Sequence, residues 1–401
     1  MVLLRLSITD KFTCSMKKQF TVLMSKSLLL AFCFFIPACQ ATLPNDSAAE
    51  KKIDNKARLN TQLVLNDAVL EQSNLKGDLI WKIRAKKTTY SDDRKIAYVK
   101  DITANLLQDE QVIIKVKGDK GEIRENGNAI LLTENVVAND VRNKSVFRGN
   151  HIEWHPLENT LVIKDNLQVN HKDLIVTANT AKYFTDVESL ELLDEVVANT
   201  INPNLLLEGE RLSWQIPQQK IISQSLIKIV RYQKEKVTDR LFADTAQIDL
   251  KAHNINLHGN VEMNSLEPEL SIAANGFIWN YRKRIINSDQ PIQLVNNLQQ
   301  FSVTGNQGKV DFKSKIATLQ NGVQGINNRE LATLYAQKAV WDIDRKEIDA
   351  LGNVIYNRTQ PNVNLTGDKA LIDLGENKAT ISSNQPTQKP VVSVVINESS
   401  Q

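Results

Sequence analysis

The chain has 401 residues, of which 42% are hydrophobic and 24% charged, with 15 glycines and 10 prolines. This composition supports a large buried core and excludes collagen-like or low-complexity material. The first 38 residues hold five Lys or Arg and one Asp, so the remaining 44 basic and 45 acidic residues give a net charge of −1, which excludes the basic surface typical of nucleic-acid binding.

Residues 1–38 have the pattern of a signal peptide. Lys17, Lys18 and Lys26 form a positive region ahead of the apolar run Leu28–Ile36. The run is short for a membrane-spanning helix and has the usual length of the apolar part of an export signal. We therefore expect the rest of the chain to lie outside the cytoplasm.

Cys39 is the candidate site of lipid attachment. The segment Ile36-Pro37-Ala38-Cys39 resembles the lipobox of bacterial lipoproteins, in which the Cys is acylated and becomes the new N-terminus. The other two cysteines, Cys14 and Cys33, precede this cleavage point, so the mature chain would keep a single thiol and no internal disulfide. Cleavage near Ala41 without lipidation, or an uncleaved membrane anchor, are the alternatives.

Residues 39–61 are polar and charged without apolar periodicity, which predicts a tether. The folded body is expected over residues 62–383. Residues 384–401 are predicted to be a flexible tail, in which the run VVSVVI could add an edge strand.

A repeat of roughly 31 residues runs through the body. The stretch SWQIPQQKII, residues 213–222, returns in similar form as IWNYRKRIIN, residues 278–287, and as VWDIDRKEID, residues 340–349. Aligning the large apolar position of each unit defines ten marker residues, spaced 29 to 34 apart: Tyr90, Ile123, Trp154, Tyr183, Trp214, Ile248, Trp279, Val310, Trp341 and Ile372. Such regular spacing is typical of stacked supersecondary modules.

The units read as β-structure. Apolar residues alternate with polar ones around each marker, as in Leu212, Trp214 and Ile216, which indicates half-buried strands. We expect about three short strands per unit, arranged as an all-β, elongated two-sheet body. Its end strands, at about residues 62–71 and 372–382, should be open edges able to pair with another chain.

Signals of catalysis or metal binding are weak. The five histidines, His151, His155, His171, His253 and His258, are scattered over predicted turns and strand ends and are read as surface residues. There is no G-x-S-x-G sequence, phosphate-binding Gly loop or Cys/His cluster. We expect no enzyme, no cofactor and no metal. A carbohydrate-active β-repeat enzyme remains a minor alternative, which would need acidic residues clustered on one exposed face.

The N-terminal part of the body resembles the LptC family of periplasmic lipopolysaccharide-export proteins, within the wider LptA/LptC/OstA-like group. Gly77, Trp81, Ala85 and the turn Tyr90-Ser91-Asp92 match its opening pattern, and the strand-rich segment GEIRENGNAILLTENVVAND follows. The chain is about twice the usual family length, which suggests a body of two tandem copies.

The resemblance implies an OstA-like β-jellyroll that binds lipid A acyl chains in an apolar groove. The implied partners are lipopolysaccharide, an inner-membrane ABC transporter complex and an LptA-like periplasmic protein that pairs through edge strands. It also implies a periplasmic, membrane-anchored location with the inner membrane favoured, although Gln40, after the candidate lipidated Cys, does not favour retention there.

The candidate groove residues are ten apolar positions that could equally form an ordinary core. They are Trp81, Tyr90, Ile123, Trp154, Tyr183, Trp214, Ile248, Trp279, Val310 and Trp341. A lipid-anchored structural or adhesive β-repeat protein, with an interior packed solid, is the alternative function.

Overall fold

The structure is a computed structural model that describes residues 62–383 and 392–395. The predicted signal peptide, the tether and Cys39 lie outside the described residues. Two 3-10 turns, η1 (Glu125–Gly127) and η2 (Pro156–Glu158), interrupt an otherwise all-β body. The strands are β1 (Val64–Ser73), β2 (Leu79–Tyr90), β3 (Ala97–Gln108), β4 (Gln111–Arg124), β5 (Ala129–Asp140), β6 (Val146–His155), β7 (Thr160–Asn170), β8 (Leu174–Phe184), β9 (Ser189–Thr200), β10 (Leu205–Gln215), β11 (Lys220–Ser223), β12 (Ile227–Gln233), β13 (Lys236–Ala243), β14 (Thr245–Asp249), β15 (Asn254–Leu266), β16 (Glu269–Asn280), β17 (Ile285–Ser288), β18 (Ile292–Asn296), β19 (Phe301–Gly305), β20 (Gln307–Asp311), β21 (Ile316–Asn327), β22 (Ala332–Asp342), β23 (Glu347–Arg358), β24 (Val363–Asp373), β25 (Lys378–Ser382) and β26 (Val392–Val395).

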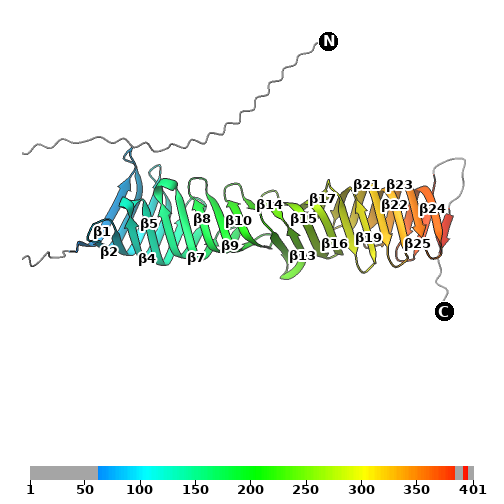
Figure 1. Ribbon diagram of the computed structural model, residues 1–401, viewed down its shortest axis with the longest axis horizontal. Helices are drawn as coiled ribbons and strands as arrows, with labels where there is room; N and C mark the ends of the chain where they lie inside the picture. Colours follow the sequence, from blue (N-terminus) through cyan, green and yellow to red (C-terminus); the bar gives the residue numbers. More distant parts are fainter. Residues whose placement is uncertain (1–61, 384–391, 396–401) are drawn as a thin grey trace, which may run out of the picture. The chain divides into compact units, whose positions relative to one another are not determined.

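The strands form one antiparallel ladder in chain order. From β1 to β10 and from β21 to β26, each strand pairs with the next one along the chain. In the middle of the body, some long strands face two short ones. The two short strands β11 and β12 pair with β10, β13 and β14 with β15, β17 and β18 with β16, and β19 and β20 with β21. Figure 1 shows the strands following one another along the β-body. The ladder is therefore continuous, and the all-β jellyroll expected from the sequence is confirmed.

The long strands bend near their middle, so each of them contributes to two sheets. The register shifts at these corners, for example between Lys164 and Leu167 and between Gln320 and Val323. Pairs of residues with positive φ occupy the corners of alternate strands: Glu134 and Asn135, Asp165 and Asn166, Asp194 and Glu195, Gly259 and Asn260, Asn321 and Gly322, and Gly352 and Asn353. Asn, Asp and Gly adopt this conformation most easily, which explains why they predominate there.

Most repeat units are one hairpin of two long, bent strands; in the units between Trp214 and Ile248 and between Trp279 and Val310, each of the two strands is divided into two short ones. Between the markers Trp154 and Tyr183, for example, lie β7 and β8, each of 11 residues. The expectation of three short strands per unit is wrong. One strand that bends at a bulge can supply both sheets, so no third strand is needed to pass between them.

The ends of the ladder differ from the expected edges on one side. Within the described residues, β1 pairs only with β2, so it forms the expected N-terminal edge. The C-terminal edge was expected near residues 372–382, but β25 in that segment pairs on both sides, with β24 and β26. The final described strand, β26, lies within the predicted tail, in the run VVSVVI that the sequence analysis named as a further candidate edge strand.

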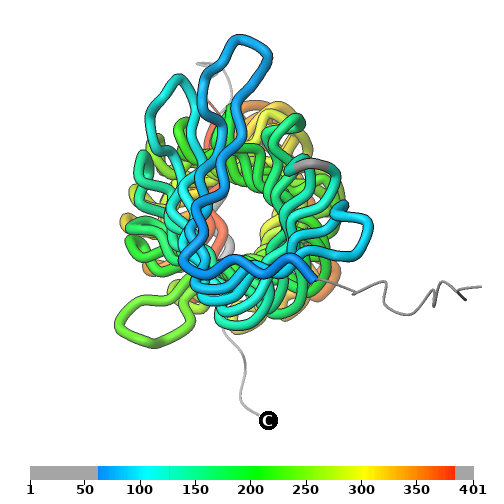
Figure 2. The backbone as a smooth tube through the Cα atoms, turned by 90° about the vertical axis from the view of Figure 1, so that its left-hand side faces the viewer, coloured from blue at the N-terminus to red at the C-terminus, as the bar shows by residue number. Residues whose placement is uncertain are grey.

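Viewed along the body, the backbone winds around a central axis (Figure 2). The space inside is filled by one continuous apolar core that includes side chains from β2 to β25. Burial alternates along the strands: in β8, Leu174, Val176 and Ala178 are buried and the residues between them are exposed. One face of each sheet therefore points inward.

Candidate functional site

The marker residues form part of an unbroken row along the inner face of one sheet. Cross-strand pairing joins Trp154 to Leu161, Leu161 to Tyr183, and Tyr183 to Leu190, and continues in this way from strand to strand. In full the row is Tyr90, Ala97, Ile123, Ile130, Trp154, Leu161, Tyr183, Leu190, Trp214, Ile221, Ile248, Ile255, Trp279, Ile286, Val310, Ala317, Trp341, Ile348, Ile372 and Ala379. We call it the marker row.

Half of the marker row was missed by the sequence reasoning. Each missed residue lies seven positions after a marker, as Leu161 follows Trp154 and Ile221 follows Trp214. The reason is geometric, because a four-residue turn after the marker strand brings the seventh residue opposite the marker. This constant spacing of aliphatic residues is the sequence signal that could have found them.

A second inward row faces the marker row from the other sheet. It comes from the other halves of the same strands and includes Phe147, Val169 and Val176. The two rows touch: the rings of Phe147 and Tyr183 lie 4.8 Å apart between centroids. Burial, together with the charge of nearby Asp140, raises the pKa of the Tyr183 hydroxyl above its usual value.

The predicted groove residues are almost all buried. Nine of the ten are at most 7% exposed, and Tyr90 is half-buried against the same core. Trp81 is the one that does not belong to the marker row. It pairs with Leu106 near the opposite ends of the strands, and its indole Nε1 donates to Gln72 Oε1 at 2.6 Å and to the carbonyl of Gly127 at 3.2 Å.

The two ends of the strands meet along a line that we call the seam. The turns that follow the markers, such as 185–188, 281–284 and 343–346, form one set, the marker turns. The turns at the opposite strand ends, such as 141–145, 171–173 and 297–300, form the second set, the return turns. Successive turns within a set are joined by backbone hydrogen bonds, for example from the Thr359 N–H to the Leu331 carbonyl.

Between the two sets, the contacts are made by side chains. Arg142 donates to the Thr185 carbonyl at 2.7 Å, Gln299 to the Ile343 carbonyl at 2.9 Å, and Arg284 to the Glu267 carbonyl at 2.8 Å. Within residues 62–383, no backbone-to-backbone hydrogen bond joins a marker turn to a return turn. The seam can therefore separate without breaking the ladder.

Two buried carboxylates strengthen the seam. The Asp140 side chain is 0% exposed and accepts from Arg142 and, at 2.8 Å, from the Tyr183 hydroxyl. The Asp239 side chain is also 0% exposed, and it lies 3.2 Å from an Nη atom of Arg231 and 3.5 Å from one of Arg284. A buried carboxylate of this kind is tolerated because cations and donors surround it.

His171 is a titratable side chain buried at the seam. Its side chain is 5% exposed, and its ring meets Trp214 across the seam with 5.1 Å between ring centroids. Burial lowers the pKa of His171 below 6.5, against the opposing effect of Asp173. Nδ1 accepts the Asp173 N–H at 3.2 Å, as a neutral ring can.

We expect the free energy of unfolding to fall as the pH drops below about 6.5, because the unfolded chain then binds a proton that the folded His171 resists. Above that pH both states hold a neutral ring and the contribution is complete. Urea unfolding between pH 7.5 and 5 measures it. His171→Gln should lose part of this pH dependence, whereas exposed His258→Gln should keep it; equal slopes for both variants would contradict the assignment.

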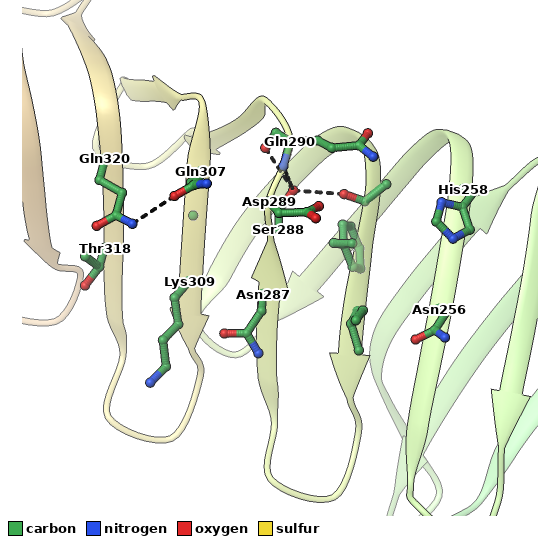
Figure 3. A pocket seen from close by; sticks show the side chains of 14 residues that line it. Asn256, His258, Asn287, Ser288, Asp289, Gln290, Gln307, Lys309, Thr318 and Gln320 are labelled. Atoms are coloured by element: carbon green, nitrogen blue, oxygen red, sulfur yellow. Dashed lines mark hydrogen bonds between the residues drawn. The ribbon is translucent and has the colours of Figure 1, made fainter. Parts of the chain in front are cut away.

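A hollow of about 610 Å³ lies on the outside of the marker sheet. Figure 3 shows its polar side chains, among them Asn256, Asn287 and Lys309. These three residues belong to a separate cross-strand row, in which Ile278 pairs with both Asn256 and Asn287, and Asn287 pairs with Lys309. Each is adjacent in sequence to a residue of the marker row, so its side chain lies on the opposite face of the sheet. The hollow is thus separated from the core by the thickness of the sheet.

The described part of the chain contains no cluster of three or more His, Cys, Asp or Glu side chains with metal-binding geometry. His171 is an exception to the reading of the histidines as surface residues, because it is buried in the seam. Over the same residues, the structure has no helix of the length and apolarity needed to cross a membrane.

Comparison with known proteins identifies the family. The family model described as "Lipopolysaccharide-assembly, LptC-related" matches residues 28–153 and again residues 202–328, together more than half of the chain. The chain belongs to the LptC-related family. The chain is therefore a component of lipopolysaccharide transport. Members of this family are transport proteins, and the family is not a known enzyme family.

Solved structures give more distant likenesses. LptH of Pseudomonas aeruginosa, the LptA-homologous periplasmic component of the lipopolysaccharide transport device, is 14% identical, with 28% of this chain and 82% of that chain covered and a TM-score of 0.25. The extracellular domain of a one-component system from B. thetaiotaomicron is 7% identical, with 80% and 82% covered and a TM-score of 0.11. No curated protein matches the sequence.

Proposed function

We propose that this LptC-related protein carries the acyl chains of lipopolysaccharide between its two sheets and passes them along the marker row to a neighbouring protein. The observation that carries the proposal is the row itself, which supplies one inward apolar residue from each hairpin strand along the ladder. Family membership suggests lipopolysaccharide as the cargo, and the marker row offers its acyl chains a continuous apolar path.

Loading requires the sheets to move apart. The marker residues other than Tyr90 are at most 7% exposed, so an acyl chain reaches them only when the seam opens. The seam is suited to this because side chains alone close it, while the backbone ladder on each side stays intact. Acyl chains would then replace contacts between the two inward rows, exchanging one apolar environment for another at little cost.

The proposed location is the periplasm, with the N-terminus held in a membrane through Cys39 and the inner membrane favoured. The two family matches support a body made of two tandem LptC-like copies, with β10 beginning the second. The open edge at β1 fits pairing with an inner-membrane transporter complex, and the far end at β26 fits pairing with an LptA-like protein. Energy for transport would come from the transporter, since the pathway needs no chemistry.

A photo-crosslinking amino acid placed at Trp154, Trp214 or Trp279 tests the proposal. We expect each of these to label lipopolysaccharide in cells, because all three lie on the marker row. The same group at Asn256, on the outer face, is the control and should label much less. Labelling of lipopolysaccharide at Asn256 alone, or at none of the positions, would contradict transport through the interior.

A structural role without cargo is the second candidate, and the packed interior favours it. Phe301 and Trp341 meet edge to face at 5.0 Å, and the cavity lined by Phe301 and Ile372 measures only about 20 Å³. If the protein is purely structural, purified protein should bind no lipopolysaccharide even in excess. Saturable binding would exclude this reading.

A further inference from the structure

Three of the tryptophans on the marker row have a buried indole N–H without an acceptor. The Nε1 atoms of Trp154, Trp279 and Trp341 are inaccessible to solvent, and none donates a hydrogen bond within the described residues. The three side chains are 5%, 0% and 1% exposed. Buried indole N–H groups usually find a partner, and one that does not lowers stability. A repeated exception at equivalent positions calls for a physical reason.

Trp81 shows that the fold can satisfy such a group. It is as deeply buried, at 3% exposure, yet its Nε1 has two acceptors, Gln72 and Gly127. Around Trp279 and Trp341, the aromatic neighbours Tyr281 and Phe301 meet the indole rings at steep angles and offer no oxygen or nitrogen acceptor to Nε1. All three unpaired donors therefore lie on the marker row, and the paired donor of Trp81 lies off it; the fourth indole of the row, that of Trp214, is not among the unpaired ones.

We infer that these three indoles are hydrogen-bond donors for the carbonyl oxygens of an acylated ligand. The inference rests on the proposed function and refines it. A pure hydrocarbon chain would leave the donors unpaired, whereas an acyl chain attached through an ester or amide brings a carbonyl acceptor with it. The interior would thus recognise acyl esters and amides in preference to hydrocarbon alone.

The spacing of the donors adds to the argument. Trp279 and Trp341 are separated along the row by Ile286, Val310 and Ala317, so one indole recurs every fourth strand. At about 4.8 Å between strands, the donors of Trp279 and Trp341 would be roughly 19 Å apart, with aliphatic side chains between them. The donor of Trp154 lies eight strands before that of Trp279, roughly 38 Å away, with Trp214 midway. A carbonyl would pair at one site, be released, and pair again at the next, while its apolar chain remained in apolar surroundings throughout.

The full-length protein labelled with ¹⁵N-tryptophan tests this directly, because its five tryptophans give five indole signals. On titration with purified lipopolysaccharide, the indole N–H signals of Trp154, Trp279 and Trp341 should move downfield, as expected for a new hydrogen bond. The signal of Trp81 should not move in this way, because its donor is already paired.

Trp→Phe variants at the three positions keep an apolar ring and remove the donor. Each should weaken lipopolysaccharide binding by about tenfold at most, the factor of one ordinary hydrogen bond. Tyr98→Phe is the control, because it removes a hydroxyl donor from an exposed side chain outside the core, and its affinity should be unchanged. Two probes separate the chemistry: a diacyl phosphatidylglycerol and its dialkyl ether analogue, of which only the ester form should lose affinity in the variants.

Two results would overturn the inference in distinguishable ways. If lipopolysaccharide binds but the three signals stay in place and the Phe variants bind as the parent does, the donors have no role and the proposed function stands without them. If lipopolysaccharide does not bind the parent protein at all, the proposed function fails and the inference fails with it.

Discussion

Crosslinking the seam should abolish uptake of lipopolysaccharide, and breaking the crosslink should restore it. Asn143 and Glu188 lie on opposite sides of the seam, and the Asn143 Nδ2 donates to Glu188 Oε2 at 2.7 Å, so cysteines at these positions can be bridged by a short reducible reagent. With the seam fixed, the two inward rows cannot separate and the marker row stays covered. Binding of fluorescent lipopolysaccharide before and after reduction measures the effect.

A crosslink that leaves the seam free provides the control. Asn135 Nδ2 donates to Asp119 Oδ2 at 2.6 Å, and both residues are exposed near the corners of β4 and β5. Cysteines bridged there join neighbouring strands without crossing the seam, so uptake should match the parent. All three natural cysteines lie before residue 40, so residues 62–383 contribute no competing thiol. Full uptake by the seam-crosslinked protein would show that lipid does not enter there.

Replacing Asp239 by Asn should lower the free energy of unfolding by about 3–5 kcal/mol, the usual cost of leaving buried cations without their counterion. Asp239 is fully buried between Arg231 and Arg284, whose side chains are only 11% and 14% exposed. The substitution keeps the shape of the side chain and removes its charge. Both guanidinium groups then remain in a site from which water is largely excluded.

Urea unfolding measures the loss as a shift of the midpoint, with the slope as a check that the same surface unfolds. Glu134→Gln is the control because its partner Lys120 and Glu134 itself are about half exposed, at 54% and 53%. Such a surface pair contributes at most about 1 kcal/mol. If the two variants unfold at the same urea concentration, the Asp239 cluster does not stabilise the seam.

The sequence predicted the interior of the protein well. Alternation around Trp214 identified which side chains point inward, and the spacing of about 31 residues identified equivalent strands. Both signals are local, because a strand has a period of two and a hairpin has a nearly constant length. The corners also have a local sequence signal, the pairs Asp165-Asn166 and Gly352-Asn353, whose residues adopt positive φ. Without recognising these pairs as corners, the alternation of apolar residues does not distinguish several short strands from one long, bent strand.

The seam could not be read from the sequence in this way. Its contacts join residues such as His171 and Trp214, or Gln299 and Ile343, which lie more than 40 positions apart. Their meeting depends on how far two sheets curl around a shared axis, a property of many small strand twists added together. For the same reason, the burial of His171 could not be foreseen from its polar neighbours Asn170 and Lys172.

The hairpin ladder has a consequence for how this protein could vary in length. Each hairpin adds two strands at about 4.8 Å each, so one extra unit of about 31 residues would extend the molecule by roughly 10 Å and leave inside and outside unchanged. A single added strand would instead place every later turn on the wrong side. The reach of such a protein can therefore grow only in whole steps, by duplication of hairpins in the gene.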